Sequence, residues 1–257
     1  MTRPGEPVTG FTGRKNHGRG HTYYIDGVKV DGVTTLLSKG LPKPALVKWA
    51  ASTAAAAAVD RWDELAQMDV SQRLKILTDA PNAARDTAAV RGTRVHALAD
   101  RLAHGDKISV PDELAGHVEA CVKFLDDWDA ETLLTETPVI SRRWSYGGTL
   151  DLVARLAGKT WLLDFKTSRS GAFGDTAFQI AAYRYADAWL HDGGEQKPIP
   201  VDECGVVWLR ADGYDLYPYH ADEGVFRQFL YIAQCARAAD ECRDYRGDAL
   251  LPPVRTP

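Results

Sequence analysis

Two aspartates and a lysine lie in neighbouring, otherwise apolar segments near the middle of the chain. Residues 160–167 alternate in the manner of a β-strand, which would place Asp164 and Lys166 side by side on one face. Asp151 belongs to the preceding apolar segment, and a hairpin that turns near Gly158 would bring it opposite Asp164. Two carboxylates held close together in an apolar sheet repel each other unless a cation lies between them. Because carboxylates offer oxygen ligands, the pattern predicts a site for Mg²⁺ or Mn²⁺.

The Asp-x-Lys pattern is weak evidence when it stands alone. Composition gives roughly one or two acid-x-Lys matches by chance in a chain of this kind, and residues 195–197 form a second one. A surface ion pair is therefore the alternative interpretation of Asp164 and Lys166. The argument for a metal site depends on Asp151 as the additional carboxylate.

Other polar residues recur at helical spacing on either side of this segment. Gln179 and Tyr183 are four residues apart and would share a helix face, as would Gly92 and His96. Gly92 would permit its helix to approach another backbone closely, although a single histidine inside a helix is more often structural than a ligand. Glu136, in the strand before the hairpin, is interpreted as a surface residue, with ligation of a second ion as the alternative.

The N-terminal half is predicted to be mostly helical. Residues 1–20 are rich in Gly, Arg and His without periodicity, so they are expected to form a flexible tail. An Asp-Gly turn at 26–27 predicts a hairpin over residues 21–30. Helix formers and capping signals then predict three helices, at residues 45–62, 82–104 and 111–129.

The C-terminal half changes to alternating strand patterns. Three antiparallel strands are predicted at 132–140, 146–156 and 160–167. A helix over 174–191 and strands at 204–210 and 214–219 follow. The last predicted helix covers 223–242 and has an apolar face formed by Val225, Phe229, Ile232 and Ala236. The expected fold class is α/β, a mixed central sheet flanked by helices with a helical N-terminal half.

Taken in order, these residues resemble the signature of the PD-(D/E)XK nuclease superfamily, and specifically its RecB-like branch of phage and recombination exonucleases. That branch has a Gly-x-x-x-His helix, a Gly-x-x-Asp strand, an Asp-x-Lys strand and a Gln-x-x-x-Tyr helix. The matching segments here are residues 92–96, 148–151, 164–166 and 179–183. The resemblance covers residues 88–190 and thins out after 200. It implies one nuclease domain over 21–257, with a hairpin and helical part at 21–130 and a restriction-endonuclease-like core at 131–257.

The resemblance also implies a role for each matched residue. His96, Asp151, Asp164 and the backbone carbonyl of Phe165 would hold the metal. Lys166 would orient or activate the attacking water and stabilise charge on the phosphate, while Gln179 and Tyr183 would support the site and contact the DNA backbone. The implied activity is a metal-dependent DNA exonuclease of phage-type recombination, replication or repair. A structure-specific or nicking endonuclease on the same core, a metal-dependent hydrolase of another substrate, and a non-catalytic DNA-binding protein stay open.

Basic residues near these segments are candidates for contacts to DNA. The window 139–184 is positive in a chain whose formal net charge is −4, although ordinary surface charge is the alternative interpretation. Arg91 and Arg94, one turn from His96, could form an end-phosphate pocket, and Arg14, Lys15 and Arg19 could add contacts from the tail. The candidate DNA-binding residues are Arg91, Arg94, Arg142, Arg143, Arg169 and Arg184.

The four cysteines contain no Cys-x-x-Cys pair, so neither a zinc site nor a secreted disulfide framework is predicted. They also do not match the spacing of relatives that carry an iron–sulfur cluster, and none is expected. The sequence has no apolar signal core or membrane span, which predicts a cytoplasmic protein (in the host cytoplasm if it is phage-encoded). The expected partner is duplex DNA with a free end, and the resemblance allows a homo-oligomer and a single-strand annealing protein.

Overall fold

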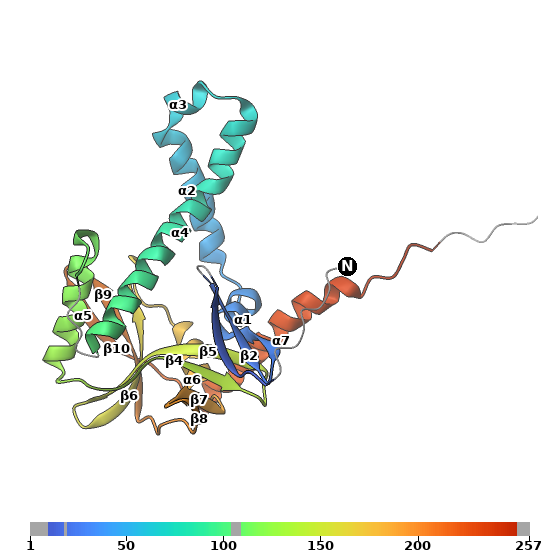
Figure 1. Cartoon of the computed structure of the whole chain (residues 1–257). Coiled ribbons are helices and arrows are strands. Elements are labelled where there is room, and N and C mark those ends of the chain that lie inside the picture. The colour runs from blue at the N-terminus through green and yellow to red at the C-terminus, as the bar shows by residue number, and fades with distance from the viewer. Residues whose placement is uncertain (1–9, 18–19, 104–108, 251–257) are drawn as a thin grey trace, which may run out of the picture.

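The computed structural model describes residues 10–17, 20–103 and 109–250. These residues form a ten-stranded mixed sheet with helices packed on both faces (Figure 1), so the fold class is α/β. None of the helices in these ranges is long and apolar enough to span a membrane.

Strand β5 (Tyr146–Leu156) is the centre of the sheet. Along one edge it pairs antiparallel with β4 (Glu131–Ser141). Two strands share its other edge. β3 (Val28–Gly32) pairs parallel with its beginning, and β6 (Lys159–Lys166) pairs antiparallel with its end. The turn between β5 and β6 uses positive φ angles at Ala157 and Gly158, as the predicted hairpin requires.

The remaining strands extend the sheet outward. β1 (Gly13–His17) and β2 (Gly20–Ile25) continue from β3, while β7 (Ala188–His191) and β8 (Gly194–Gln196) continue from β4. Beyond β6 lie β9 (Glu203–Arg210), which is parallel to it, and β10 (Gly213–Pro218). Residues 195–197, the chance Asp-x-Lys-like match, lie exposed at the β8 end of the sheet.

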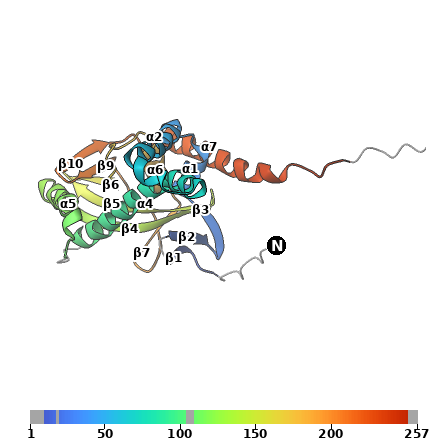
Figure 2. The ribbon, with the colours of Figure 1, turned by 90° about the horizontal axis from the view of Figure 1, so that it is seen from above.

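Each face of the sheet has its own hydrophobic core. On one face pack α1 (Val33–Gly40), α6 (Thr176–Arg184) and α7 (Glu223–Glu241), with Leu162 and Cys204 among the buried residues. On the other pack α4 (Val70–Ala103), the 3-10 turn Asp112–Leu114 and α5 (Ala115–Asp127), with Leu163 and Cys121. The alternation of β6 therefore directs Leu162 and Leu163 to opposite cores, as predicted. Figure 2 shows α5 beside β9 and β10 at one end of the body and α7 at the other.

A helical arm projects from this body (Figure 1). It consists of α2 (Pro44–Asp60), α3 (Trp62–Ala66) and the first half of α4, and α2 packs against α4 without burying any of its own residues. Helix α4 has 34 residues and so extends about 50 Å, with Pro81 inside it. The predicted start at residue 82 was wrong, because the helix begins at Val70, includes a run of good helix formers at residues 72–75, and continues through Pro81.

Two further expectations were wrong. Residues 13–17 of the expected tail form β1 and pair with β2, whereas residues 1–9 and 18–19 lie outside the described ranges. The helix expected to reach residue 191 ends at Arg184, because residues 188–191 instead pair with β4 and bury Trp189 completely. On α7 the predicted face is rotated slightly, so that Phe226 and Ala233 are buried while Val225 and Ile232 are only partly so.

Candidate active site

Three carboxylates lie in a row across adjacent strands. The register of β4 and β5 places Glu136 opposite Asp151. The β5–β6 register, continued one step beyond its last pair, Leu152 with Leu163, brings Asp151 level with Asp164. The pairing of Asp151 with Asp164 is the one that the hairpin predicted. The Phe165 backbone N–H donates a 2.8 Å hydrogen bond to Asp151 Oδ2, which fixes that carboxylate against β6.

Glu136 differs from its interpretation as a surface strand residue. Its φ of +40° lies in the left-handed region, which costs energy for a residue with a side chain. Its side chain is only 29% exposed and lies beside His96 and Arg14. The pattern of β4 alone could not reveal this, because His96 and Arg14 come from segments distant in sequence.

His96 of α4 completes the cluster. Its Nδ1 lies 3.5 Å from Asp151 Oδ1 and 3.9 Å from Glu136 Oε1, and its Nε2 lies 3.0 Å from the Phe165 carbonyl oxygen. His96, Glu136 and Asp151 offer ligand atoms that all lie within 4.8 Å of one another. The structure thus brings together three of the four predicted metal ligands and adds Glu136.

The fourth predicted ligand, Asp164, lies beside this group and is 2% exposed. Gln179 Nε2 donates a 2.6 Å hydrogen bond to Asp164 Oδ1, and Lys166 Nζ lies 2.6 Å from Asp164 Oδ2. Lys166 also donates a 3.4 Å hydrogen bond to Gln179 Oε1. Asp164 Oδ2 nevertheless accepts no well-oriented hydrogen bond from the described residues, which leaves a buried carboxylate oxygen available for a ligand.

Tyr183 lies behind the carboxylates and is only 4% exposed. Its ring packs on Gly148, where an added Cβ would lie 2.3 Å from Tyr183 Cε1. Position 148 must therefore be a glycine, because the Tyr183 ring occupies the space that a side chain there would need. A Cβ on Gly92, by contrast, would only touch the Thr167 hydroxyl at 3.4 Å, so the close backbone approach expected there was wrong.

Burial and the neighbouring charges shift the pKa values of the ionisable groups in the cluster. Burial lowers the pKa of His96, but the facing Asp151 and the other carboxylates outweigh burial and bring it to about 9. Burial raises the pKa of Glu136, and the neighbouring charge of Asp151 adds to this. Burial raises the pKa of Asp164 more than Lys166 lowers it. Burial lowers the pKa of Lys166, but Asp164 and Asp151 raise it above its usual value, so the ammonium stays charged.

The donor set fits a hard divalent cation. Mg²⁺ takes oxygen ligands at about 2.1 Å in octahedral geometry, so ligands on opposite sides of the ion are about 4.2 Å apart. The His96–Asp151 and His96–Glu136 separations of 3.5 and 3.9 Å lie within this span. A histidine nitrogen among carboxylates also suits Mn²⁺. Such an ion would offset the repulsion between the neighbouring carboxylates of Glu136 and Asp151.

The cluster lines a cleft of about 710 Å³ between the β1–β2 hairpin and α4. Arg14 of β1 donates hydrogen bonds to Glu136 Oε2 at 3.4 Å and to Thr149 Oγ1 at 3.1 Å. The Tyr23 hydroxyl lies 2.9 Å from the same threonine oxygen. The sequence predicted Arg14 only as a tail residue and did not predict Tyr23 or Thr149 as part of the site. Tyr23 could not be predicted from local pattern, because the β1–β2–β3 strands reach the cleft through the distant pairing of β3 with β5. The lining residues not predicted as part of the site include Asn16, His21, Tyr23, Thr93, Asp100 and Thr149.

The six arginines proposed for DNA do not line this cleft. Arg142 pairs with Asp26 and Glu195, and Arg143 stacks over the Trp144 ring. Arg184 donates hydrogen bonds to the carbonyl oxygens of Val201 and Ala221, and its assignment to DNA binding stays a prediction. Arg169 is exposed just beyond β6. Arg91 and Arg94 line a separate cavity beside α5, so the expected phosphate pocket adjoining the metal site was wrong.

Comparisons with known proteins add little to this geometry. No family model matches the sequence, and no curated protein matches it. Among solved structures, one described as "Crystal structure of SSO0001" aligns with a TM-score of 0.31 and 16% identity, over 49% of this chain and 57% of that chain. A likeness of this size carries no argument about fold or function.

Proposed function

We propose that the protein hydrolyses phosphodiester bonds of DNA with a divalent metal ion, on a restriction-endonuclease-like core. The observation that carries the proposal is the row of Glu136, Asp151 and Asp164 across three strands, with His96 and Lys166 at its sides. Residues from four sequence segments that resemble the nuclease signature meet in this one cleft. A surface ion pair, the alternative for Asp164 and Lys166, does not account for the burial of Asp164, whose side chain is 3% exposed.

His96, Glu136, Asp151, Asp164 and the Phe165 carbonyl would hold Mg²⁺ or Mn²⁺. Such an ion lowers the pKa of bound water and neutralises charge that develops on the phosphate. Lys166 is held charged by its two carboxylate neighbours, so it orients the attacking water and stabilises the phosphate oxygens rather than accepting a proton. Gln179 bridges Asp164 and Lys166 and keeps both in place. Tyr183 supports the strand that carries Asp151.

An exonuclease is the form of this activity that we favour. The cleft has the volume of a small-molecule site, which suits the end of a strand better than the wall of an intact duplex. It is also bounded by α4 on one side and by the β1–β2 hairpin on another, and both lie close to the carboxylates. A structure-specific or nicking endonuclease is the alternative on the same site.

The test compares linearised with covalently closed plasmid in Mg²⁺, followed on a gel over time. We expect loss of the linear form only, and no loss when the metal is chelated. Lys166→Ala should reduce the rate by at least about a hundredfold, the usual cost of removing one transition-state donor. Lys159→Ala is the matched control, because Lys159 begins the same strand and is exposed in an ion pair with Glu203.

Equal loss of both plasmid forms would favour the endonuclease. A Lys166→Ala protein that cuts at the wild-type rate, or a wild type that cuts neither form with either metal, would reject the assignment. Circular dichroism of each variant shows whether a lost activity reflects lost folding.

A further inference from the structure

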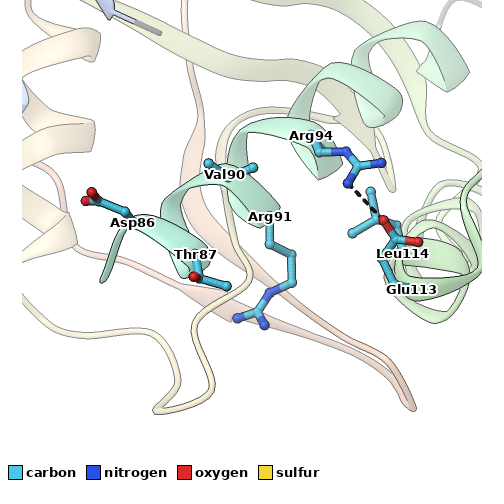
Figure 3. Close-up of a pocket in the computed structure, with 7 residues that line it drawn as sticks. All are labelled: Asp86, Thr87, Val90, Arg91, Arg94, Glu113 and Leu114. Carbon is cyan, nitrogen blue, oxygen red and sulfur yellow. Dashed lines mark hydrogen bonds and ion pairs between the residues drawn. The ribbon is translucent and has the colours of Figure 1, made fainter. Parts of the chain in front are cut away.

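A second cavity, of about 490 Å³, lies between α4 and the beginning of α5 (Figure 3). The α4 residues that line it differ from those that line the catalytic cleft, namely Thr93, His96, Ala97 and Asp100. The two spaces therefore open on different faces of the same helix. The lining residues of the second cavity are Asp86, Thr87, Val90, Arg91, Arg94, Glu113 and Leu114.

Most charges around this cavity are already matched. Arg94 pairs with Glu113 at 2.9 Å, and Asp86 lies 3.7 Å from Arg85. Arg91 differs, since its buried Nε has no hydrogen-bond partner and no ion pair joins it to any of the described residues. Figure 3 shows its side chain reaching away from α4, while that of Arg94 turns toward Glu113.

His117 of α5 lies close enough to Arg91 for the positive charge of Arg91 to affect it. Its Nδ1 is also buried without a hydrogen-bond partner among the described residues. Burial, and then the positive charge of Arg91, lower the pKa of His117. A buried guanidinium nitrogen and a buried imidazole nitrogen are both costly to leave unsatisfied, so an acceptor from outside the chain would stabilise this region.

The chemistry of that acceptor follows from the donor. The guanidinium fork matches the oxygens of a phosphate, and Val90 and Leu114 give the cavity an apolar wall. The cavity volume also falls in the range of small-ligand sites. We infer that the Arg91 cavity binds a phosphate ester with an apolar portion, as a nucleotide carries.

Two sources can supply this chemistry, a free nucleotide and a nucleotide within a DNA strand. The second source rests on the proposed function. It has a structural basis in the residue next to Arg91, because Gly92 lies against Thr167, which directly follows the catalytic lysine on β6. Arg169, three residues beyond the end of β6, is exposed.

The experiment measures binding to the full chain in chelator, so that cleavage plays no part. Calorimetric titrations use inorganic phosphate and thymidine monophosphate, and fluorescence anisotropy uses a short labelled single-stranded oligonucleotide. Arg91→Gln removes the charge at similar size, and Arg91→Lys retains the charge without the fork. Lys123→Gln is the matched control, because Lys123 is an exposed α5 residue paired with Asp127 outside the cavity.

We expect at least one nucleotide probe to bind the wild type and the Lys123→Gln protein equally. Arg91→Gln should weaken that binding by about tenfold or more, with Arg91→Lys between them. If binding of thymidine monophosphate depends on Arg91, a free nucleotide is a ligand of the cavity. If only binding of the oligonucleotide depends on Arg91, the ligand is a nucleotide within a DNA strand. The inference is overturned if no probe binds, or if Arg91→Gln and Lys123→Gln behave alike. Cleavage that fails while Arg91-dependent binding persists would reject the nuclease and leave the cavity assignment intact.

Discussion

Glu136 occupies a backbone conformation that costs energy, beside two other carboxylates. Strain of this kind persists only where the surrounding structure holds it, and it is concentrated at functional sites. Neutralising this side chain removes one of three like charges, while its contact with Arg14 is long and partly exposed. A protein in which Glu136 is neutralised should therefore be as stable as the wild type, or more stable, without metal, and it should bind metal more weakly.

The corresponding prediction concerns Glu136→Gln. Thermal unfolding in chelator should occur at the wild-type temperature or above, whereas the stabilisation on adding Mn²⁺ should shrink by about 1 kcal/mol or more. Glu131→Gln is the control, because Glu131 begins the same strand and is exposed in an ion pair with Arg155. If Mn²⁺ stabilised both variants equally, Glu136 would not be a metal ligand.

His96 makes the stability of the metal-free protein depend on pH. Its pKa rises from 6.5 in the unfolded chain to about 9 in the fold, so the protonated form is favoured by folding. The stabilisation is complete below the unfolded value and is lost as pH rises from about 6.5 to about 9. Its full size is on the order of 3 kcal/mol.

This prediction is measured by urea unfolding in chelator across that pH range. The wild type should lose stability toward alkaline pH, and His96→Gln should show a flatter profile. If the two profiles have the same slope, another group titrates and the assignment of the pKa to His96 is wrong.

At the scale of elements, β5 and α6 pack against each other at Gly148 and Tyr183. An alanine at Gly148 would place its Cβ 2.3 Å from Cε1 of the Tyr183 ring, which is only 4% exposed, so the ring or the strand must shift. Overpacking of this kind costs about 1–3 kcal/mol. Because Asp151 lies on the same strand, the carboxylate row should also shift.

We therefore expect Gly148→Ala to lower the free energy of unfolding by about 1–3 kcal/mol in chemical denaturation, and to lower metal affinity. Gly174→Ala is the control, since an added Cβ there meets nothing within 4 Å. A double variant that also carries Tyr183→Leu should recover part of the loss. Equal stability of Gly148→Ala and Gly174→Ala would contradict the packing argument.

The elements also show why the sequence predicted some parts and not others. The hairpin of β5 and β6 is local, and its alternation and turn residues are sufficient to predict the Asp151–Asp164 pairing. Strands β1 and β7 have only five and four residues. β7 pairs with the distant β4, and the β1–β2–β3 strands join the rest of the sheet only through the distant pairing of β3 with β5, so nothing in their own residues distinguishes them from a tail or the end of a helix. The same reason explains why Tyr23 and Asn16 were missed at the cleft. Glu136 was interpreted as a surface residue because its neighbours in the cleft, His96 and Arg14, come from segments distant in sequence.

At the scale of the whole molecule, charge opposes DNA. The formal net charge is −4, and the cleft is lined by four carboxylates, those of Asp100, Glu136, Asp151 and Asp164, against the cations of Arg14, His96 and Lys166. A polyanion should therefore enter the cleft only after a divalent ion has neutralised part of this charge. We expect the Asp151→Asn protein, which has lost one carboxylate, to bind DNA in chelator more tightly than the wild type does.

The measurement is anisotropy with a labelled oligonucleotide in chelator, with Asp202→Asn as the control outside the cleft. The gain should diminish at high salt, because the interaction is screened. Unchanged affinity in Asp151→Asn would show that the bound strand avoids the carboxylate row.

The parallel pair of β3 and β5 has a consequence for how the chain reaches this structure. It joins Asp31 to Tyr146, segments about 115 residues apart, and the whole helical arm lies between them. Pairings this distant form slowly, because a long loop must close first. During synthesis the β1–β2–β3 strands emerge early but have no sheet edge to join until β5 is complete. The wall of the cleft that carries Arg14 and Tyr23 is therefore made first and docked late, and the carboxylate row remains open on that side until then.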